Sequence, residues 1–263
     1  MTGGLDDDLR FALELADAAD AITMARHRAE NLVVETKPDR TPVTDADRAV
    51  EQALRELIAR ERPQDEVIGE EFGDSAGGGS HAGTGPRAWI IDPIDGTASY
   101  LRGMPTWSTL IALRENGVIT AGVVSMPALG RRWRARRGGG AFADGQRIQV
   151  SAIAALEDAQ LTWSGIREWD EVGRTEAIVE LIRSCWRSRG IGDAWQYMLV
   201  AEGAADVALD PSVSIWDLAA VSLIVEEAGG RFTDLAGRPT PDGGSGLATN
   251  GLLHDAVLRI VGR

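Results

Sequence analysis

One stretch near the middle of the chain, residues 89–97, most constrains what the protein can fold into. Residues 89–91 are apolar and predict a buried strand, which we expect to end at Asp92 because Pro93 cannot donate a hydrogen bond to a sheet. Asp92 and Asp95 then project together, and two such carboxylates repel unless a cation lies between them. Mg²⁺ prefers oxygen ligands of this kind. The alternative is an ordinary turn, in which Asp, Pro and Gly are common.

The two residues that follow suit an anionic ligand. Gly96 permits a close approach of the backbone to a ligand, and Thr97 adds a hydroxyl group. The N–H groups after Gly96 can form an anion-binding nest or the first turn of a helix. The stretch therefore predicts that a cation and a phosphate bind side by side.

Two remote stretches carry further acids. Residues 67–71 form another apolar run that ends in Glu70 and Glu71, and residues 214–220 place Asp217 at the start of a strongly apolar helix. Together with residues 89–97 they resemble the signature of the inositol monophosphatase family, which are Mg²⁺-dependent, lithium-sensitive phosphomonoesterases. The resemblance covers nearly the whole chain. It implies a mixed α/β fold, the layered α-β-α-β-α sandwich of the inositol monophosphatase and fructose-1,6-bisphosphatase type.

The resemblance also implies roles for individual residues. It implies two or three Mg²⁺ ions per site, with Mn²⁺ as a possible substitute and Li⁺ as an inhibitor. The implied metal ligands are Glu70, Asp92, the carbonyl oxygen of Ile94, Asp95 and Asp217. The implied catalytic residues are Glu70 and Thr97, which orient the attacking water, and Asp47. The implied phosphate-binding residues are Gly96, Thr97 and Ala98.

Composition excludes several other classes of function. The chain has 27 Lys and Arg against 40 Asp and Glu, and its net charge of −13 argues against nucleic acid or an anionic membrane as a partner. The single cysteine, Cys185, excludes an internal disulfide and is typical of the cytoplasm. We expect neither a signal peptide nor a membrane span. The three histidines lie in no recognisable zinc or nucleophile motif. The partners expected are a small phosphomonoester and, by resemblance, a second copy in a homodimer.

The first half should contain two helices and a set of strands. Periodicity predicts a long helix over residues 5–28 and a second that begins at Thr44 or Asp45 and ends before Pro63. Asp47 matches an acid that the family carries near the start of this second helix, and Lys37 matches a lysine on the preceding loop. The alternative for both is a solvated face. Glycine-rich residues 73–86 form either a mobile flap over the metals or a tolerated insertion.

Residues 107–150 should form an antiparallel meander with turns at Asn116-Gly117 and Gly130. The basic run over residues 131–137 is interpreted as an edge strand with alternating charges facing water. We place a boundary near Ser151. Residues 1–150 then carry the metal- and phosphate-binding motifs, and residues 151–263 supply Asp217 and contacts to the leaving group.

The second half alternates helices and strands, which predicts a mostly parallel sheet flanked by helices. One helix is expected over residues 169–186, and another begins near Asp193. The remaining expected elements are a strand over 207–209 that ends at Asp210, a helix over 216–228, strands over 231–233 and 246–249, and a helix over 252–261.

Three stretches, residues 102–107, 192–197 and 248–251, resemble the histidinol-phosphate phosphatase branch of the family. This branch hydrolyses L-histidinol phosphate to L-histidinol and phosphate in histidine biosynthesis, by means of a metal-activated water. The substrate carries an ammonium and an imidazole, so its pocket should offer acids and an aromatic wall. The implied contacts to the leaving group are Asp193, Trp195 and Asp210. The two acids could instead be an N-cap and a loop residue.

Two departures from the family pattern concern this end of the site. Asp210 stands where the family more often has glutamate, and Ala98-Ser99 replaces larger side chains. An inositol-1-phosphate or broad sugar-phosphate phosphatase is therefore the nearest alternative. A bisphosphonucleotide phosphatase would need a second anion site, for which only residues 131–137 are available. The intact set of acids argues against a non-catalytic regulator.

Overall fold

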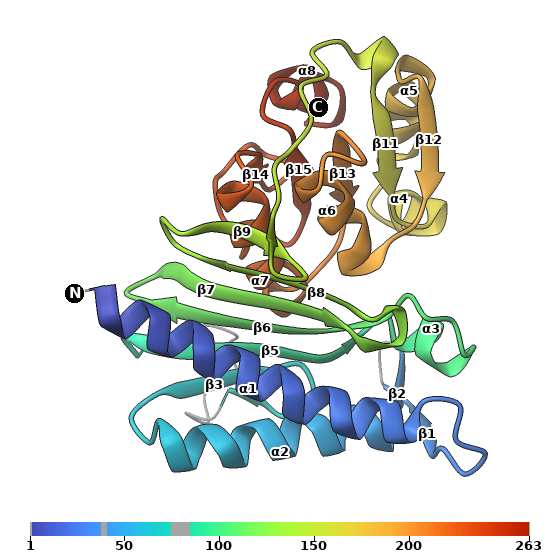
Figure 1. The fold of residues 1–263 in the computed structure, drawn as a ribbon. Coiled ribbons are helices and arrows are strands. Elements are labelled where there is room, and N and C mark those ends of the chain that lie inside the picture. Colours follow the sequence, from blue (N-terminus) through green and yellow to red (C-terminus); the bar gives the residue numbers. More distant parts are fainter. Residues whose placement is uncertain (1, 38–40, 75–84, 263) are drawn as a thin grey trace.

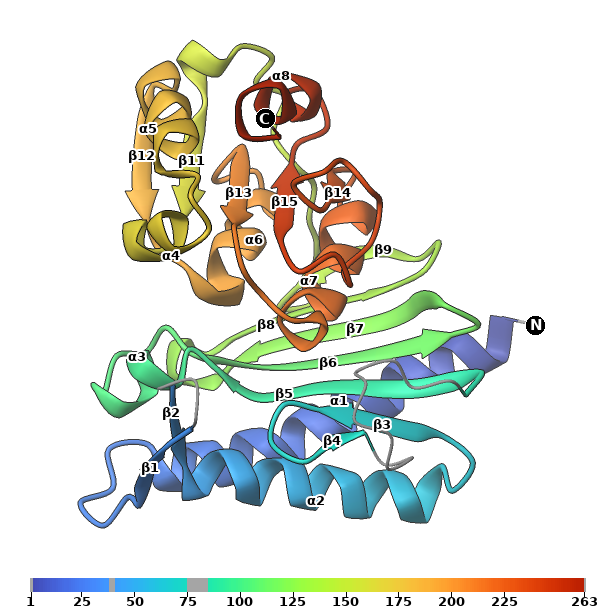
Figure 2. The same ribbon diagram turned by 180° about the vertical axis from the view of Figure 1, so that it is seen from behind.

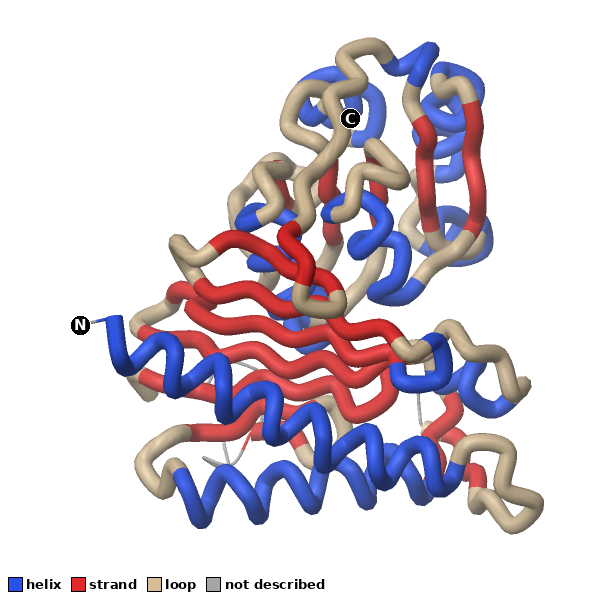
Figure 3. The backbone as a smooth tube through the Cα atoms, viewed as in Figure 1, coloured by secondary structure: helices blue, strands red, loops and turns tan. Residues whose placement is uncertain are grey.

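The computed structural model describes residues 2–37, 41–74 and 85–262, which form alternating layers of helices and sheets (Figures 1 and 2). Helices α1 and α2 cover one face of an eight-stranded sheet. Helices α6 and α7 lie between that sheet and a five-stranded one, whose far side is covered by α5 and α8. The tube representation shows the same order of layers (Figure 3). The expected α-β-α-β-α sandwich is confirmed.

The first helical layer forms as the periodicity predicts. Its helices are α1 (Thr2–Arg26) and α2 (Asp45–Glu61). Thr44 caps α2, because its hydroxyl accepts hydrogen bonds from the N–H groups of Ala46 and Asp47. The buried sides of both helices pack on the sheet around Trp89, whose ring meets Phe11 edge-on with centroids 5.3 Å apart. A small hairpin precedes α2 and consists of β1 (Val34–Thr36) and β2 (Pro42–Thr44).

The eight-stranded sheet has the order β10-β9-β8-β7-β6-β5-β3-β4, and only β3 and β5 pair in parallel. Its strands are β3 (Glu66–Gly69), β4 (Gly73–Asp74), β5 (Arg87–Asp95), β6 (Ser108–Glu115), β7 (Val118–Met126), β8 (Arg131–Arg136), β9 (Gly140–Ala143) and β10 (Gln146–Arg147). The meander is thus confirmed. The flap hypothesis for residues 73–86 falls mainly on residues 75–84, which lie outside the described residues.

Strand β5 does not end at Asp92, and this expectation was wrong. It continues through Pro93 to Asp95, with a shift of register between Asp92 and Asp95. Such a bulge tolerates proline, because the residues inside it make no regular ladder hydrogen bonds. The hydroxyl of Thr109 donates to the carbonyl oxygen of Pro93 at 2.7 Å and holds the bulge to β6. The bulge keeps both aspartates at one end of the strand.

Strand β8 is not an edge strand, contrary to expectation, because β7 and β9 pair with its two sides. Its arginines do not form an open basic surface. Arg132 pairs with Asp17 and Asp20 of α1, and Arg131 pairs with Asp144 and Glu202. Its other two arginines, Arg134 and Arg136, meet the ring of Phe142 and Asp6, and Arg137, just after the strand, pairs with Glu226. These charges join layers of the fold.

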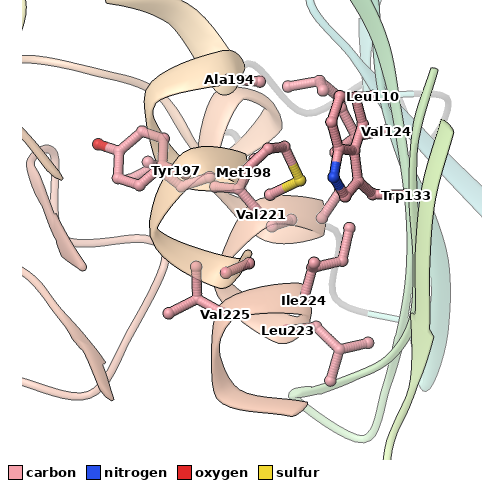
Figure 4. Close-up of a cluster of buried hydrophobic side chains, with 14 of the residues drawn as sticks. Leu110, Val124, Trp133, Ala194, Tyr197, Met198, Val221, Leu223, Ile224 and Val225 are labelled. Atoms are coloured by element: carbon pink, nitrogen blue, oxygen red, sulfur yellow. The ribbon is translucent and has the colours of Figure 1, made fainter. Parts of the chain in front are cut away.

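The central layer consists of α6 (Asp193–Ala201) and α7 (Ile215–Glu227). Figure 4 shows apolar side chains of both helices facing Leu110, Val124 and Trp133 of the first sheet. The backbones of β7 and α7 approach closely at Gly122, where an added Cβ would lie 3.0 Å from the carbonyl oxygen of Ala220. Residues 218–225 of α7 are apolar apart from Ser222, because this part of the helix is covered on both sides.

The five-stranded sheet has the order β12-β11-β13-β15-β14. Its strands are β11 (Gln160–Trp163), β12 (Arg187–Gly190), β13 (Val207–Asp210), β14 (Arg231–Thr233) and β15 (Gly246–Thr249). The sheet is mixed rather than mostly parallel, because β15 pairs antiparallel with both β13 and β14. Its outer helices are α4 (Ile166–Glu171), α5 (Thr175–Ser184) and α8 (His254–Val261).

The single helix expected over residues 169–186 is two helices, α4 and α5. Gly173 interrupts it with a φ of 71°, a left-handed conformation that ends the first helix. Residues 187–190 are strand β12. The proposed boundary near Ser151 falls between β10 and β11, although α7 of the second half packs on the sheet of the first. None of the helices in the described ranges is long and apolar enough to span a membrane.

We predict that Gly122→Val lowers the free energy of unfolding by about 1–3 kcal/mol, because the added atoms meet the backbone of α7. Denaturant unfolding measures the effect. Val118→Thr is the control, since Val118 lies on the same strand and is 48% exposed. Equal stabilities of the two variants would contradict the close packing of α7 on β7.

Candidate active site

A cavity of about 460 Å³ opens where the two halves of the chain meet. The first half contributes Glu70, residues 92–98 except Pro93, and Thr41 and Pro42. The second half contributes the segments that follow β11 and β12, the start of α6, Asp210, and residues near the start of α7. The structure thus brings together acids that are up to 147 positions apart in the sequence, from Glu70 to Asp217.

Three carboxylates form the centre of this cavity. Oxygen atoms of Asp92, Asp95 and Asp217 all lie within 4.8 Å of one another. Asp92 is buried, and its Oδ1 has no hydrogen-bond partner among the described residues. Burial and the nearby charges of Glu70 and Asp95 raise the pKa of Asp92 well above its usual range. An unpartnered oxygen inside a cluster of like charges fits a divalent cation.

Hydrogen bonds fix the other two carboxylates. Asp95 accepts bonds from the hydroxyl of Ser108 at 2.9 Å and from the N–H of Ala194 at 2.7 Å. The second bond ties the first turn of α6 to the end of β5. Asp217 accepts a bond from the N–H of Ser214 at 2.7 Å. Burial, followed by nearby acids, raises the pKa of Asp217 to about 8, whereas burial raises that of Asp95 to about 6 against these hydrogen bonds.

Glu70 follows β3 and reaches the cavity from the side of the first helical layer. Its Oε1 lies 2.7 Å from Nζ of Lys37, which contacts Oε1 of Glu71 at the same distance. Burial alone would lower the pKa of Lys37, but the two carboxylates outweigh burial and raise it. Burial raises the pKa of Glu71 to about 7 in spite of Lys37. Lys37, the lysine expected on this loop, therefore offsets part of the negative charge of Glu70 and Glu71.

A residue that the sequence analysis missed supports this loop. Glu51 of α2 is fully buried and accepts hydrogen bonds from the N–H groups of Glu71 at 2.7 Å and Phe72 at 3.1 Å. Arg55 donates to the same carboxylate at 2.8 Å. Glu51 follows Asp47 by four positions and therefore lies on the same face of the helix. This spacing could have identified Glu51 from the sequence. Glu51 positions the backbone directly after Glu70.

Asp47 lies outside the cavity lining and contacts Thr97, which is part of it. Its Oδ2 accepts hydrogen bonds from the N–H and hydroxyl groups of Thr44, and its Oδ1 lies 3.2 Å from Oγ1 of Thr97. The hydroxyl of Thr97 also lies 3.0 Å from the carbonyl oxygen of Ile94. With its proton directed at one of these two acceptors, Thr97 keeps a lone pair that can accept a hydrogen bond within the cavity.

Gly96 joins β5 to the short helix α3 (Thr97–Leu101). Its φ of 81° is left-handed, and an added Cβ would lie 2.7 Å from Oδ2 of Asp193. The left-handed backbone favours glycine here, and a side chain would also displace the carboxylate of Asp193. Ala98, the other predicted phosphate-binding residue, also lines the cavity.

A second acidic group lines the cavity beyond the three central carboxylates. Asp193 is not the N-cap of α6, which was the alternative interpretation. It is the first residue of the helix, and Gly192 holds the N-cap position. Asp210 is not a loop residue either. It ends β13, and it accepts hydrogen bonds from Gln196 at 2.5 Å and from the hydroxyl of Tyr197 at 2.6 Å. Figure 4 shows this hydroxyl pointing away from the apolar core.

Burial and mutual repulsion raise the pKa values of Asp193 and Asp210. Burial, followed by Asp95, Asp210 and Glu168, raises the pKa of Asp193 to about 8. Burial also raises the pKa of Asp210 to about 7, although the hydroxyl of Tyr197 opposes the shift. Trp195 does not join these acids. It lies outside the cavity lining and packs against the core between the two sheets.

The cavity is acidic throughout. Within the described ranges its lining contains no lysine, arginine or histidine. Sequence reasoning missed Glu168 of α4, which lines the cavity, because the residues around it match no motif.

Comparisons with known proteins agree with this geometry. A profile of the inositol monophosphatase family matches residues 5–262. Proteins named histidinol-phosphatase from Mycobacterium tuberculosis and Streptomyces coelicolor are 54% and 51% identical over 257 and 261 residues, covering 96% of each chain. The solved structure of a Thermotoga maritima IMPase superposes with a TM-score of 0.85 at 32% identity, covering 97% of this chain and 96% of the other. The chain therefore belongs to the inositol monophosphatase family.

Proposed function

We propose that this protein is a Mg²⁺-dependent phosphomonoesterase that hydrolyses L-histidinol phosphate to L-histidinol and phosphate. One observation carries the proposal. The cavity holds a three-carboxylate cluster and two further aspartates, the half-buried Asp193 and the buried Asp210, without a basic residue in the described lining. Relatives named histidinol-phosphatase, at 54% and 51% identity over 96% of each chain, support the same reaction.

The residues for a metal centre are in place. Asp92, Asp95 and Asp217 would hold Mg²⁺ together with Glu70 and the carbonyl oxygen of Ile94. Bound Mg²⁺ supplies the positive charge that attracts and polarises the phosphate, which this lining does not otherwise offer. We include two or three ions per site, Mn²⁺ as a substitute and Li⁺ as an inhibitor in the proposal, on the strength of the family.

The chain's own residues position the reactants. Glu70 accepts a proton or hydrogen bond from the attacking water. A lone pair of Thr97 orients that water, because the hydroxyl proton of Thr97 is directed at Asp47 or at the carbonyl oxygen of Ile94. The backbone at Gly96, Thr97 and Ala98 faces the phosphate. Lys37 limits the net charge around Glu70.

The leaving alcohol is recognised by charge. Asp193 and Asp210 have pKa values raised to about 8 and about 7, so without a partner both bind protons readily near neutral pH. A substrate ammonium favours their charged forms and replaces those protons. A neutral polyol offers no such compensation, which favours histidinol phosphate over an inositol phosphate. The proposal retains Trp195 only as a support for α6, through its packing against the core.

The other readings have less support. A bisphosphonucleotide needs a second anion site, and the arginines of residues 131–137 are engaged with acids and an aromatic ring outside the cavity. A non-catalytic regulator would have no need of the buried acidic cluster. Homodimerisation and a cytoplasmic location remain part of the proposal. The half-buried thiol of Cys185 fits that location, because burial raises its pKa to about 11 and makes it unreactive.

The first prediction from the proposed function concerns the metal. Mg²⁺ at a hundred times its dissociation constant should stabilise the metal-free protein by about 2.7 kcal/mol. Asp217→Asn should lose most of this stabilisation and nearly all turnover, because it removes one charge from the cluster. Thermal unfolding with and without EDTA measures the effect, and Asp242→Asn, at an exposed acid, serves as the control. Full activity after EDTA treatment and dialysis would refute the metal assignment.

The second prediction concerns Glu70. Glu70→Gln should reduce kcat by about 10²–10⁴-fold and change KM little, since general bases typically contribute this much. Steady-state kinetics at saturating Mg²⁺ separates the two constants. A loss below about tenfold in kcat would show that Glu70 takes no part in water activation.

The third prediction separates the substrates. Asp193→Asn and Asp210→Asn should each lower kcat/KM for L-histidinol phosphate by more than about tenfold, because removing one partner of a desolvated charge pair commonly costs ~2–5 kcal/mol. The same variants should hydrolyse p-nitrophenyl phosphate nearly as well as the wild type, because that ester has no ammonium. Equal losses on the two esters would mean that these aspartates support the metal centre or the fold instead.

A further inference from the structure

Glu168 stands at the part of the cavity that the reaction itself does not use. It lies on α4, which begins directly after β11, and its neighbours Ser164 and Gly165 line the same cavity. Residues Ile191 and Gly192, which follow the parallel strand β12, complete this wall. Ligands of such sheets commonly bind beyond the carboxyl ends of parallel strands. Glu168 is therefore placed at a ligand-facing edge of the second sheet.

The carboxylate of Glu168 has no ion-pair partner within residues 2–37, 41–74 and 85–262, although it is half-buried. The other charged residues of its helix are exposed. Arg167 pairs with Glu171 at 3.0 Å, and Asp170 accepts a hydrogen bond from the hydroxyl of Thr175. Helix α4 thus directs one acid into the cavity and its other charged side chains to the surface, so the unpaired charge of Glu168 is available to a ligand.

Glu168 also lies on a definite side of the cavity. Its charge acts on Asp193 and Asp210, and raises the pKa of both. Asp193 precedes Ala194, whose N–H binds Asp95 of the metal cluster. Asp210 ends β13, which pairs with β11 directly before the segment that carries Glu168. These contacts place the two aspartates between the metal cluster and Glu168.

L-Histidinol phosphate has its charges in a matching order. The ester oxygen is followed by a methylene group, by the carbon that bears the ammonium, by a second methylene group and by the imidazole ring. A phosphate placed at the three-carboxylate cluster would direct the ammonium toward Asp193 and Asp210 and the ring further along the cavity. Ile191 and Val213 offer apolar contacts to such a ring in the cavity lining.

We propose that Glu168 is a specificity-determining residue that binds the imidazole ring of L-histidinol phosphate by accepting a hydrogen bond from a ring N–H. The inference rests on the proposed function and adds to it the recognition of the second cationic group. The ammonium is then bound by Asp193 of α6 and Asp210 of β13, and the ring by Glu168 of α4. An aromatic ring without N–H groups should gain nothing from Glu168.

The test compares two esters that differ only in the ring, L-histidinol phosphate and L-phenylalaninol phosphate. Glu168→Gln should lower kcat/KM for the first by about tenfold, mainly through KM, because a half-buried charge pair is weaker than a fully buried one. Its kcat/KM for L-phenylalaninol phosphate should change less than about twofold. Inhibition by the product L-histidinol should weaken by the same factor as KM. Glu168→Ala, which also removes the acceptor, should lose at least as much.

Glu171→Gln is the matched control, because Glu171 is an exposed glutamate on the same helix. It should leave kcat/KM for both esters and the inhibition constant of L-histidinol unchanged. Equal losses of Glu168→Gln on both esters, or no loss on L-histidinol phosphate, would overturn this inference while the proposed function stands. Failure of the wild type to hydrolyse L-histidinol phosphate would overturn both.

Discussion

The repulsion among Asp92, Asp95 and Asp217 is the constraint on which the site depends. Three carboxylates within 4.8 Å of one another are held inside the protein, where burial already disfavours their charges. Such an arrangement lowers stability unless protons or cations compensate it. The raised pKa values of Asp95, Asp193, Asp210 and Asp217 express the first kind of compensation. A divalent cation supplies the second and makes the cluster chemically useful.

Because the cluster repels itself, the surrounding fold has to hold it together. Asp95 is tied to β6 by Ser108 and to α6 by the N–H of Ala194, while Asp217 is fixed to the start of α7 by the N–H of Ser214. Helices α6 and α7 are in turn packed between the two sheets (Figure 4). The apolar central layer therefore holds acids from the two halves of the chain in place, and the site forms only when both halves are folded against each other.

The same logic explains the selectivity that we propose. Acids that lie beyond the metal cluster, at Asp193, Asp210 and Glu168, have no basic partner in the described lining. A substrate with two cationic groups supplies the missing charge at each. The structure thus uses one kind of side chain for two purposes, with metal ions attracting the phosphate and the substrate's own cations satisfying the remaining acids.

Much of this arrangement could be predicted from local sequence. The cap at Thr44 and the meander follow from short-range rules and were confirmed, and the acids that flank the apolar runs lie together in one cavity. Features set by tertiary contacts were missed. The bulge at Pro93 depends on pairing with β6, and β8 lies inside the sheet because β9 returns beside it. Neither Glu168 nor the packing of Trp195 into the core has a local signature.

A substrate panel with Mg²⁺ tests the central claim most directly. It compares kcat/KM for L-histidinol phosphate, inositol 1-phosphate and a 3′,5′-bisphosphonucleotide under one set of conditions. The account predicts that L-histidinol phosphate exceeds both by about a hundredfold or more, because a substrate without cations leaves buried carboxylates unpaired. An equal or higher value for inositol 1-phosphate would contradict it.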